Sequence, residues 1–176
     1  MNKVLREEKK FLISVADFIK LSHKVEQVML SDPHNGTHGY MIRSLYFDTP
    51  FDDDYQEKQA GVELRRKVRL RCYDPAASYA MLELKQKQGA QQMKRSLKVS
   101  REDAKRLIAG DYSVLLNYTE PFAAEMYGLM QYRCYRPKRL LNITAKPLLL
   151  RKIKFVSPLI IKSFPLKAVL IFSIPI

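Results

Sequence analysis

Cysteine and acidic residues are both scarce in this chain of 176 residues. Cys72 and Cys134 are its two cysteines, which are too few for a disulfide framework in a chain of this size. The 18 Asp and Glu residues stand against 31 Lys and Arg residues, so the formal net charge is +13. Such an excess indicates an anionic partner: nucleic acid, a phosphate compound or an acidic membrane surface.

Long apolar segments are also missing. The first residues, "MNKVLREEKKFLI", contain no apolar run of signal-peptide length, so we expect no secretion signal. The late run "AVLIFSIPI" is far shorter than the roughly 20 residues that cross a membrane as a helix. With so few cysteines, a reducing cytoplasmic location is the expectation. The length and the apolar content, 47%, suit one domain with a core of its own.

Hydrophobic periodicity predicts an α+β chain. Strands are expected at 4–14, 40–50, 62–73, 80–89 and 91–100. Helices are expected at about 15–30, 100–110 and 120–135. The last three strands are typical of an antiparallel meander with short links. Ser14 with Asp17, and Ser100 with Asp103, have the spacing of capping boxes in which Asp replaces Glu.

The third expected strand, "VELRRKVRLRCY", is the most basic part of the chain. Five of the seven residues from Arg65 to Arg71 are Lys or Arg. Because strand side chains point alternately to opposite faces, Lys67 and Arg69 share a face with Arg71. The intervening residues are aliphatic from position 68 onward, so one face of this strand is charged and the other apolar.

The other strands repeat this division between a charged and an apolar face. Their charged sets are Arg6, Glu8 and Lys10 in the first strand, Glu83, Lys85 and Lys87 in the next, and Lys94 in the last. A solvated outer face is the simplest interpretation, but such faces mix both signs because like charges opposite each other repel. A bound polyanion explains the excess better, since arginines hold phosphate oxygens bidentately and lysines act as point charges. Glu8 and Glu83 would then suit a divalent ion that bridges phosphates.

In order and spacing, these segments resemble the VTC-type polyphosphate polymerase domains of the CYTH-like, triphosphate tunnel superfamily. The resemblance covers about residues 3–138, and its markers are "REEKKF", "SLYFDTP", "GVELRRKVRLRCY", "LELKQK" and "KRS". It implies an α+β fold in which an antiparallel β-barrel forms a tunnel with flanking helices. The charged strand faces would then point inward and line the tunnel.

Carried over by position, the resemblance also assigns residues and chemistry. It implies phosphate contacts for Lys10, Arg69, Arg71 and Lys85, with further contacts from Lys67, Lys87, Lys94 and Arg6. It places Glu8 where tunnel enzymes often carry metal-binding acids, although VTC-type members take a key metal-binding glutamate from their C-terminal half. The implied reaction transfers the γ-phosphoryl group of a nucleotide to polyphosphate with Mg²⁺ or Mn²⁺. The implied partners are nucleoside triphosphate and polyphosphate, not nucleic acid, and a membrane-associated partner stays open.

After Lys138 the chain changes character. Residues 139–176 contain no Asp or Glu and do not alternate cleanly. The family would supply further strands here, of the "EY.R" and "IRITF" types, and a late glutamate. Read one base out of step, the codons of residues 154–159 can encode "KIRITF". We therefore predict that residues 1–138 are the N-terminal part of a tunnel domain and that residues 139–176 are an out-of-frame, non-family tail. A diverged tail is the alternative.

Two further groups of side chains suit a metal only weakly. His23, His34 and His38 lack a cysteine or an acid at zinc-ligand spacing, so surface histidines are the better interpretation. The acidic run "DTPFDDDY" at 48–55 lacks the pattern of a calcium-binding EF-hand. We expect it to form a solvated loop, or to make salt bridges to the basic strands.

Three other functions remain open from the sequence. A triphosphatase or an adenylyl cyclase of the same tunnel fold would show a fuller alternation of N-terminal glutamates, whereas here Glu8 alone is in phase. A non-catalytic module that binds polyphosphate or nucleic acid is the third. Basic strands interleaved with aromatic residues would favour nucleic acid. Here the basic residues alternate with aliphatic ones, which favours phosphate over bases.

Sequencing the gene across codons 130–180 tests the predicted frameshift near codons 136–140. We expect a one-base change to restore "EY" and "KIRITF" in one frame. We also expect the 176-residue product to be poorly stable, aggregation-prone and inactive as a polymerase, because a barrel without its later strands has open edges. An intact frame would contradict the first expectation. A cooperative melt together with ATP-dependent polyphosphate synthesis would contradict the second.

Overall fold

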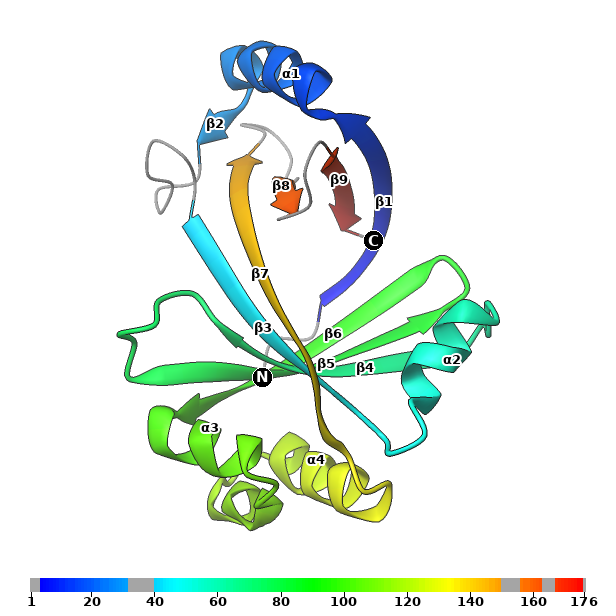
Figure 1. Ribbon diagram of the computed structural model, residues 1–176, viewed down its shortest axis with the longest axis vertical. Coiled ribbons are helices and arrows are strands. Elements are labelled where there is room, and N and C mark those ends of the chain that lie inside the picture. The colour runs from blue at the N-terminus through cyan, green and yellow to red at the C-terminus, as the bar shows by residue number, and fades with distance from the viewer. Residues whose placement is uncertain (1–3, 32–39, 150–155, 163–166, 176) are drawn as a thin grey trace. The chain divides into compact units, whose positions relative to one another are not determined.

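The computed structural model describes residues 4–31, 40–149, 156–162 and 167–175, and it describes side chains for residues 11–30, 40–143 and 145. The chain divides into two compact units (Figure 1). Unit 1 consists mainly of Arg43–Leu141, and unit 2 of Leu5–Ile42 and the chain from Asn142 onward. The predicted basic strands at 62–73, 80–89 and 91–100 belong to unit 1, whereas the strand at 4–14 belongs mainly to unit 2.

Unit 1 is built on a sheet in which neighbouring strands follow the order β7-β3-β4-β5-β6. The strands are β3 (Tyr40–Asp48), β4 (Arg65–Cys72), β5 (Tyr79–Gln88), β6 (Gln91–Ser100) and β7 (Arg136–Leu149). The pairs β3–β4, β4–β5 and β5–β6 are all antiparallel. Gly89, with φ of +56°, lies in the two-residue link between β5 and β6, where a tight hairpin needs positive φ. The predicted meander is thus confirmed.

Three helices cover one face of this sheet (Figure 1). They are α3 (Arg101–Ile108), the 3₁₀ helix η1 (Tyr112–Asn117) and α4 (Pro121–Tyr132). The apolar faces of the strands and helices form the core of unit 1, whose largest buried members are Leu82, Leu84, Leu107, Leu115, Phe122, Met126, Met130 and Tyr135. Because this face holds the aliphatic residues of the strands, the charged residues in the alternate positions lie on the other face.

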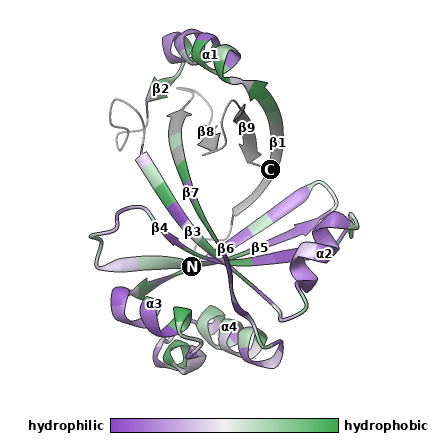
Figure 2. Cartoon of the chain, viewed as in Figure 1, coloured by the Kyte–Doolittle hydropathy of each residue, from purple (hydrophilic) through white to green (hydrophobic). Residues whose placement is uncertain are grey.

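A fourth helix of unit 1, α2 (Asp53–Gln59), lies in the connection from β3 to β4. Figure 2 shows α2 as hydrophilic along its length, whereas the strands of unit 1 mix hydrophilic and hydrophobic residues. The short η1 was not predicted, because six residues are too few for a helical period to show.

Both predicted capping boxes are confirmed. Ser100 Oγ accepts a hydrogen bond from the Asp103 N–H at 3.0 Å and donates one to Asp103 Oδ2 at 2.8 Å. Ser14 and Asp17 make the same pair of bonds at the start of α1 (Val15–Val28). Each serine satisfies a helix N–H that has no partner within the helix, which stabilises the helix by about 1 kcal/mol.

Unit 2 contains β1 (Val4–Ser14), α1 (Val15–Val28), β2 (Leu30–Ser31), the later part of β7, β8 (Val156–Lys162) and β9 (Lys167–Pro175). Its strands are paired in the order β2-β7-β8-β9-β1, and every pair is antiparallel. No helix in the described ranges is long and apolar enough to cross a bilayer.

The α+β class with antiparallel strands and flanking helices is therefore confirmed, but the expected lack of strands after Lys138 is not met. The backbone forms β7 as far as Leu149 and then β8 and β9. These segments are rich in Leu, Ile and Val. Branched apolar residues such as Ile and Val favour strands, so strand formation here does not show whether the segment is read in the original frame. The frameshift therefore stays a prediction.

Candidate functional site

The register between β4, β5 and β6 places basic side chains opposite one another on the face of the sheet away from α3 and α4. Lys67 lies opposite Lys85, and Lys85 lies opposite Lys94. One step further along the strands, Arg65 lies opposite Lys87. We call this surface the basic face; its cationic residues are Arg65, Lys67, Arg69, Arg71, Lys85, Lys87, Lys94 and Lys98.

Glu83 lies at the centre of the basic face and is 1% exposed. Its Oε2 accepts a hydrogen bond from Arg69 Nε at 2.6 Å and is also 2.6 Å from Arg69 Nη2. Lys94 Nζ lies 3.5 Å from Oε1, and Arg71 Nε lies 3.9 Å from Oε2. Three cations thus surround one carboxylate, and the cluster keeps an excess of positive charge.

The charge state of Glu83 follows from this environment. Burial by itself would raise the pKa of the Glu83 carboxyl, but the charges of Arg69, Arg71 and Lys94 hold it below its ordinary value. Glu83 is therefore ionised at neutral pH. It acts as the counter-ion that holds Arg69 in place, and the Arg69 side chain is also buried, with 6% of the residue exposed.

Tyrosines border these cations, and sequence reasoning missed them. Arg69 Nη1 donates to the Tyr46 hydroxyl at 3.2 Å, and Arg71 Nη1 donates to the Tyr73 hydroxyl at 3.1 Å. Tyr46 lies opposite Arg69 in the register of β3 and β4. The signal in the sequence was the phase, because Tyr73 continues the alternate positions of the arginines at 69 and 71.

The structure brings most of the predicted site residues together. Those on the basic face are Lys67, Arg69, Arg71, Glu83, Lys85, Lys87 and Lys94. Arg6, Glu8 and Lys10 lie on β1 in unit 2, where they are opposite Pro175, Ser173 and Ile171 of β9. The side chains of these three residues lie outside the described set, so their roles as phosphate and metal ligands stay predictions.

The described side chains do not by themselves fit a resident divalent metal. No group of three or more His, Cys, Asp or Glu residues in the described part of the chain could hold one. Mg²⁺ and Mn²⁺ prefer several oxygen ligands, and both oxygens of Glu83 already face cations. His23 is exposed on α1, and the other two histidines lie outside the described residues.

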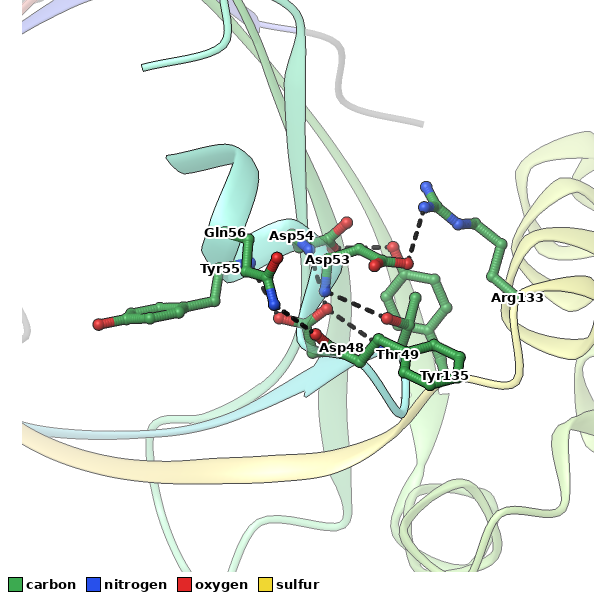
Figure 3. A network of polar contacts seen from close by, with 9 residues as sticks. Asp48, Thr49, Asp53, Asp54, Tyr55, Gln56, Arg133 and Tyr135 are labelled. Atoms are coloured by element: carbon green, nitrogen blue, oxygen red, sulfur yellow. Dashed lines mark hydrogen bonds and ion pairs between the residues drawn. The ribbon is translucent and has the colours of Figure 1, made fainter. Parts of the chain in front are cut away.

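A second polar cluster surrounds α2 and contains the acidic run predicted to be a solvated loop (Figure 3). Asp48 is buried and accepts hydrogen bonds from the backbone N–H groups of Thr49, Asp54 and Tyr55 at 2.8–3.0 Å. It therefore satisfies N–H groups in the first turn of α2 that have no partner within the helix.

The expectation for this run was wrong in two respects. Asp54 is buried, 3% exposed, and not solvated. The ion pairs of the run are formed with cations outside the basic strands: Arg133 Nη2 lies 3.1 Å from Asp53 Oδ2, and Lys138 Nζ lies 3.1 Å from Asp52 Oδ1. Arg66 of β4 also acts on the run, since its charge lowers the pKa of Asp54. The two ion pairs connect α2 and its N-cap to the end of α4 and to β7, so the cluster is structural.

The Asp54 carboxyl has an unusual proton affinity. Burial raises its pKa from 3.8 to about 6; the hydrogen bond that Tyr135 donates to Oδ2 at 2.8 Å opposes the rise, and the charge of Asp48 adds to it. Oδ1 is buried without a hydrogen-bond partner. A proton on this oxygen would remove the cost of a buried negative charge.

Comparisons with known proteins agree with this architecture. A family model, the VTC domain, matches residues 5–144. A Bacillus halodurans protein provisionally named an adenylate cyclase is 17% identical with a TM-score of 0.64, over 98% of this chain and 82% of that one. A Hippeastrum protein provisionally named an adenylyl cyclase, with a dominant triphosphatase activity, is 12% identical with a TM-score of 0.64, over 97% of this chain and 79% of that one. A Vibrio parahaemolyticus protein, also provisionally named an adenylate cyclase, is 12% identical with a TM-score of 0.53, over 96% of this chain and 75% of that one. No curated protein sequence matches this chain significantly.

Glu83→Gln tests the role of the buried carboxylate. We expect the free energy of unfolding to fall by about 3 kcal/mol in chemical denaturation, because Arg69 would stay buried without its counter-charge. The matched control is Glu125→Gln, which breaks the more exposed pair with Arg95 and should cost at most about 1 kcal/mol. Equal losses in the two variants would show that Glu83 has no special role in stability.

Asp54→Asn tests the raised pKa. Since the folded protein holds this proton more tightly than the unfolded chain, the wild type should lose the contribution of Asp54 as pH rises from about 4 through 6. Asparagine cannot ionise and can still accept the Tyr135 hydrogen bond. The stability of the variant relative to wild type should therefore improve between pH 4.5 and pH 7.5 in denaturant titrations. A difference that does not change with pH would rule out the effect.

Proposed function

The chain belongs to the VTC domain family, and we propose that it binds nucleoside triphosphate and polyphosphate on the basic face of unit 1. The observation that carries this proposal is the row formed by Lys67, Lys85 and Lys94, which lie opposite one another on adjacent strands. Like charges so placed destabilise a sheet. A row of this kind is favourable where a ligand with several negative charges binds across it.

The two kinds of cation on this face suit a phosphate chain in different ways. The guanidinium of Arg69 is held by Glu83 and Tyr46, so its position is fixed before a ligand arrives. Fixed donors of this kind bind phosphate oxygens without a reorganisation cost. Successive residues on one strand face are about 6.6 Å apart, so a phosphate chain that lies along the strands meets one row of cations after another.

Beyond binding, we propose the reaction that the family resemblance implies. A terminal oxygen of polyphosphate attacks the γ-phosphorus, the bond from that phosphorus to the β–γ bridging oxygen breaks, and nucleoside diphosphate leaves. Charge accumulates on the transferred group and on the leaving oxygen, and neighbouring cations stabilise both. The arrangement needs no covalent protein intermediate. The Mg²⁺ or Mn²⁺ expected for the family would be held chiefly by phosphate oxygens, and the role of Glu8 as a ligand stays a prediction from the resemblance.

A triphosphatase is the second candidate, and the likeness to the Hippeastrum protein favours it. In that reaction water takes the place of polyphosphate as the acceptor. Incubation with ATP separates the candidates: long polyphosphate indicates a polymerase, free phosphate a triphosphatase and cyclic nucleotide a cyclase. Binding without turnover would fit a non-catalytic module, and it would also fit the loss of polymerase activity that the predicted frameshift implies for this chain. We propose a cytoplasmic location for the protein, which the scarcity of cysteine in the chain supports.

Lys85→Ala tests the proposed binding face. Inorganic tripolyphosphate binding, measured by calorimetry, should weaken by about tenfold or more, because a hydrogen bond to a charged group contributes about 1.5–3 kcal/mol. The matched control is Lys105→Ala, which removes the same charge from the exposed surface of α3. Its affinity should stay within about twofold of wild type.

Two results would contradict the proposal. Equal weakening in the two lysine variants would indicate attraction to the net charge alone. Failure of the folded wild-type chain to bind tripolyphosphate would remove the binding function altogether.

A further inference from the structure

The basic face is not uniform along its length. The end next to the β5–β6 hairpin carries Arg65 opposite Lys87, after the lysine row. At the other end, next to the loop between β4 and β5, aromatic and apolar side chains join the cations. This end consists of Arg71, Tyr73, Tyr79, Met81 and Lys98, and we call it the aromatic end.

The register fixes this arrangement. Met81 of β5 lies between Arg71 of β4 and Lys98 of β6, directly opposite each of them. Tyr79 is two residues before Met81 on β5 and therefore lies on the same face of the sheet. Together these side chains place a thioether between two cations and an aromatic ring beside Lys98.

Both tyrosines of the aromatic end are partly exposed and next to a cation. Tyr79 is 39% exposed, and Lys98 Nζ lies 4.2 Å from the centre of its ring. Tyr73 is 40% exposed, and Arg71 Cζ lies 5.6 Å from the centre of its ring. Exposed aromatic rings beside cations are typical of surfaces on which nucleobases stack, because the ring supplies a π-face and the cation supplies charge for the attached phosphates.

Arg71 provides an additional observation. Its Nη1 donates to the Tyr73 hydroxyl, but its Nε is buried and has no hydrogen-bond partner. A buried donor without a partner is costly, and a phosphate oxygen is an acceptor that would satisfy it. This donor lies at the boundary between the aromatic end and the central Glu83 cluster.

We propose that the aromatic end binds the base of a nucleoside triphosphate, whose phosphates run from Arg71 past Arg69 toward the lysine row. The polyphosphate chain then occupies the far end of the basic face, near Arg65 and Lys87. This inference rests on the proposed function and specifies how the nucleotide is oriented along the basic face. Because stacking uses the π-face that all bases share, the site prefers nucleotides to bare triphosphate but discriminates weakly among bases.

The dimensions of the strand agree with this direction. Arg71 and Lys67 are four residues apart on β4, which corresponds to about 13 Å along a strand. An extended ribose and triphosphate have to bridge that length, and the side chain of Arg69 lies halfway along it. The reverse orientation would place the base between Arg65 and Lys87, where the register provides no aromatic residue.

The test compares ATP with inorganic tripolyphosphate, which has the phosphates but no base. For Tyr79→Ala we expect ATP to bind at least about fivefold more weakly than to wild type, since a base stacks on such a ring. Tripolyphosphate affinity should stay within about twofold. Tyr79→Phe should retain ATP affinity because it keeps the ring. Tyr132→Ala, which removes a 90% exposed tyrosine from α4, is the matched control and should change neither ligand.

The two ligands keep the two proposals apart. If Tyr79→Ala keeps the wild-type ratio of ATP to tripolyphosphate affinity, the base site is wrong and the phosphate site stands. If wild type does not bind tripolyphosphate, the proposed function fails and this inference fails with it. Tyr79→Leu replaces the alanine variant if a thermal melt shows that Tyr79→Ala does not fold. An unchanged ratio in Tyr79→Leu likewise overturns the base site.

Discussion

The ion pair between Arg69 and Glu83 is the interaction on which the basic face depends. A carboxylate that is 1% exposed is costly to bury, and here the charges around it provide the compensation. Arg69 contributes two nitrogens at 2.6 Å, while Arg71 and Lys94 approach from either side at longer distances. Glu83 thereby joins β4, β5 and β6 at one point. Its single negative charge also limits the repulsion among the surrounding cations.

The apolar side of the same strands decides where these charges lie. Leu82 and Leu84 flank Glu83 in sequence and are fully buried in the core with α3, η1 and α4. A shift of one residue in the strand register would turn these leucines toward the charged face and Glu83 into the core. Packing of the leucines therefore fixes the pairing of Arg69 with Glu83 and the alignment of the lysine row. Binding chemistry on one face is thus a consequence of packing on the other.

The sequence predicted the elements of this arrangement well and their relations less well. Alternation in "VELRRKVRLRCY" and "LELKQK" was enough to predict β4, β5 and the division of their residues between two faces. It could not predict that Arg69 lies opposite Glu83, because a single sequence carries no direct information on register between strands. Glu83 was accordingly interpreted as a metal ligand, a role for which the described structure offers no partner acids.

Long-range contacts explain the other differences. The acidic run at 48–55 has the composition of a solvated loop, yet Asp54 is buried because Tyr135, 81 positions away, donates a hydrogen bond to it. The aromatic end was overlooked for a related reason. Its tyrosines lie at the strand ends next to the loop between β4 and β5, beyond the alternation of basic and aliphatic residues at the strand centres, although the register returns both to one region.

The division of arginine and lysine along the basic face follows from the physics of the two side chains. Arg69 and Arg71 lie nearer the aromatic end and have hydroxyl or carboxylate partners that orient their planar guanidinium groups. Such groups suit a ligand held in one position, as a nucleotide must be for phosphoryl transfer. The row of lysines beyond them presents ammonium groups on flexible stems, which act as point charges without a preferred bidentate geometry. A polymer that advances by one phosphate after each transfer requires contacts that re-form equally well in every register. Under the proposed function, the oriented Arg69 and Arg71 therefore suit the nucleotide and the lysine row suits the polymer, while Lys98 at the nucleotide end and Arg65 at the polymer end add charge to either side.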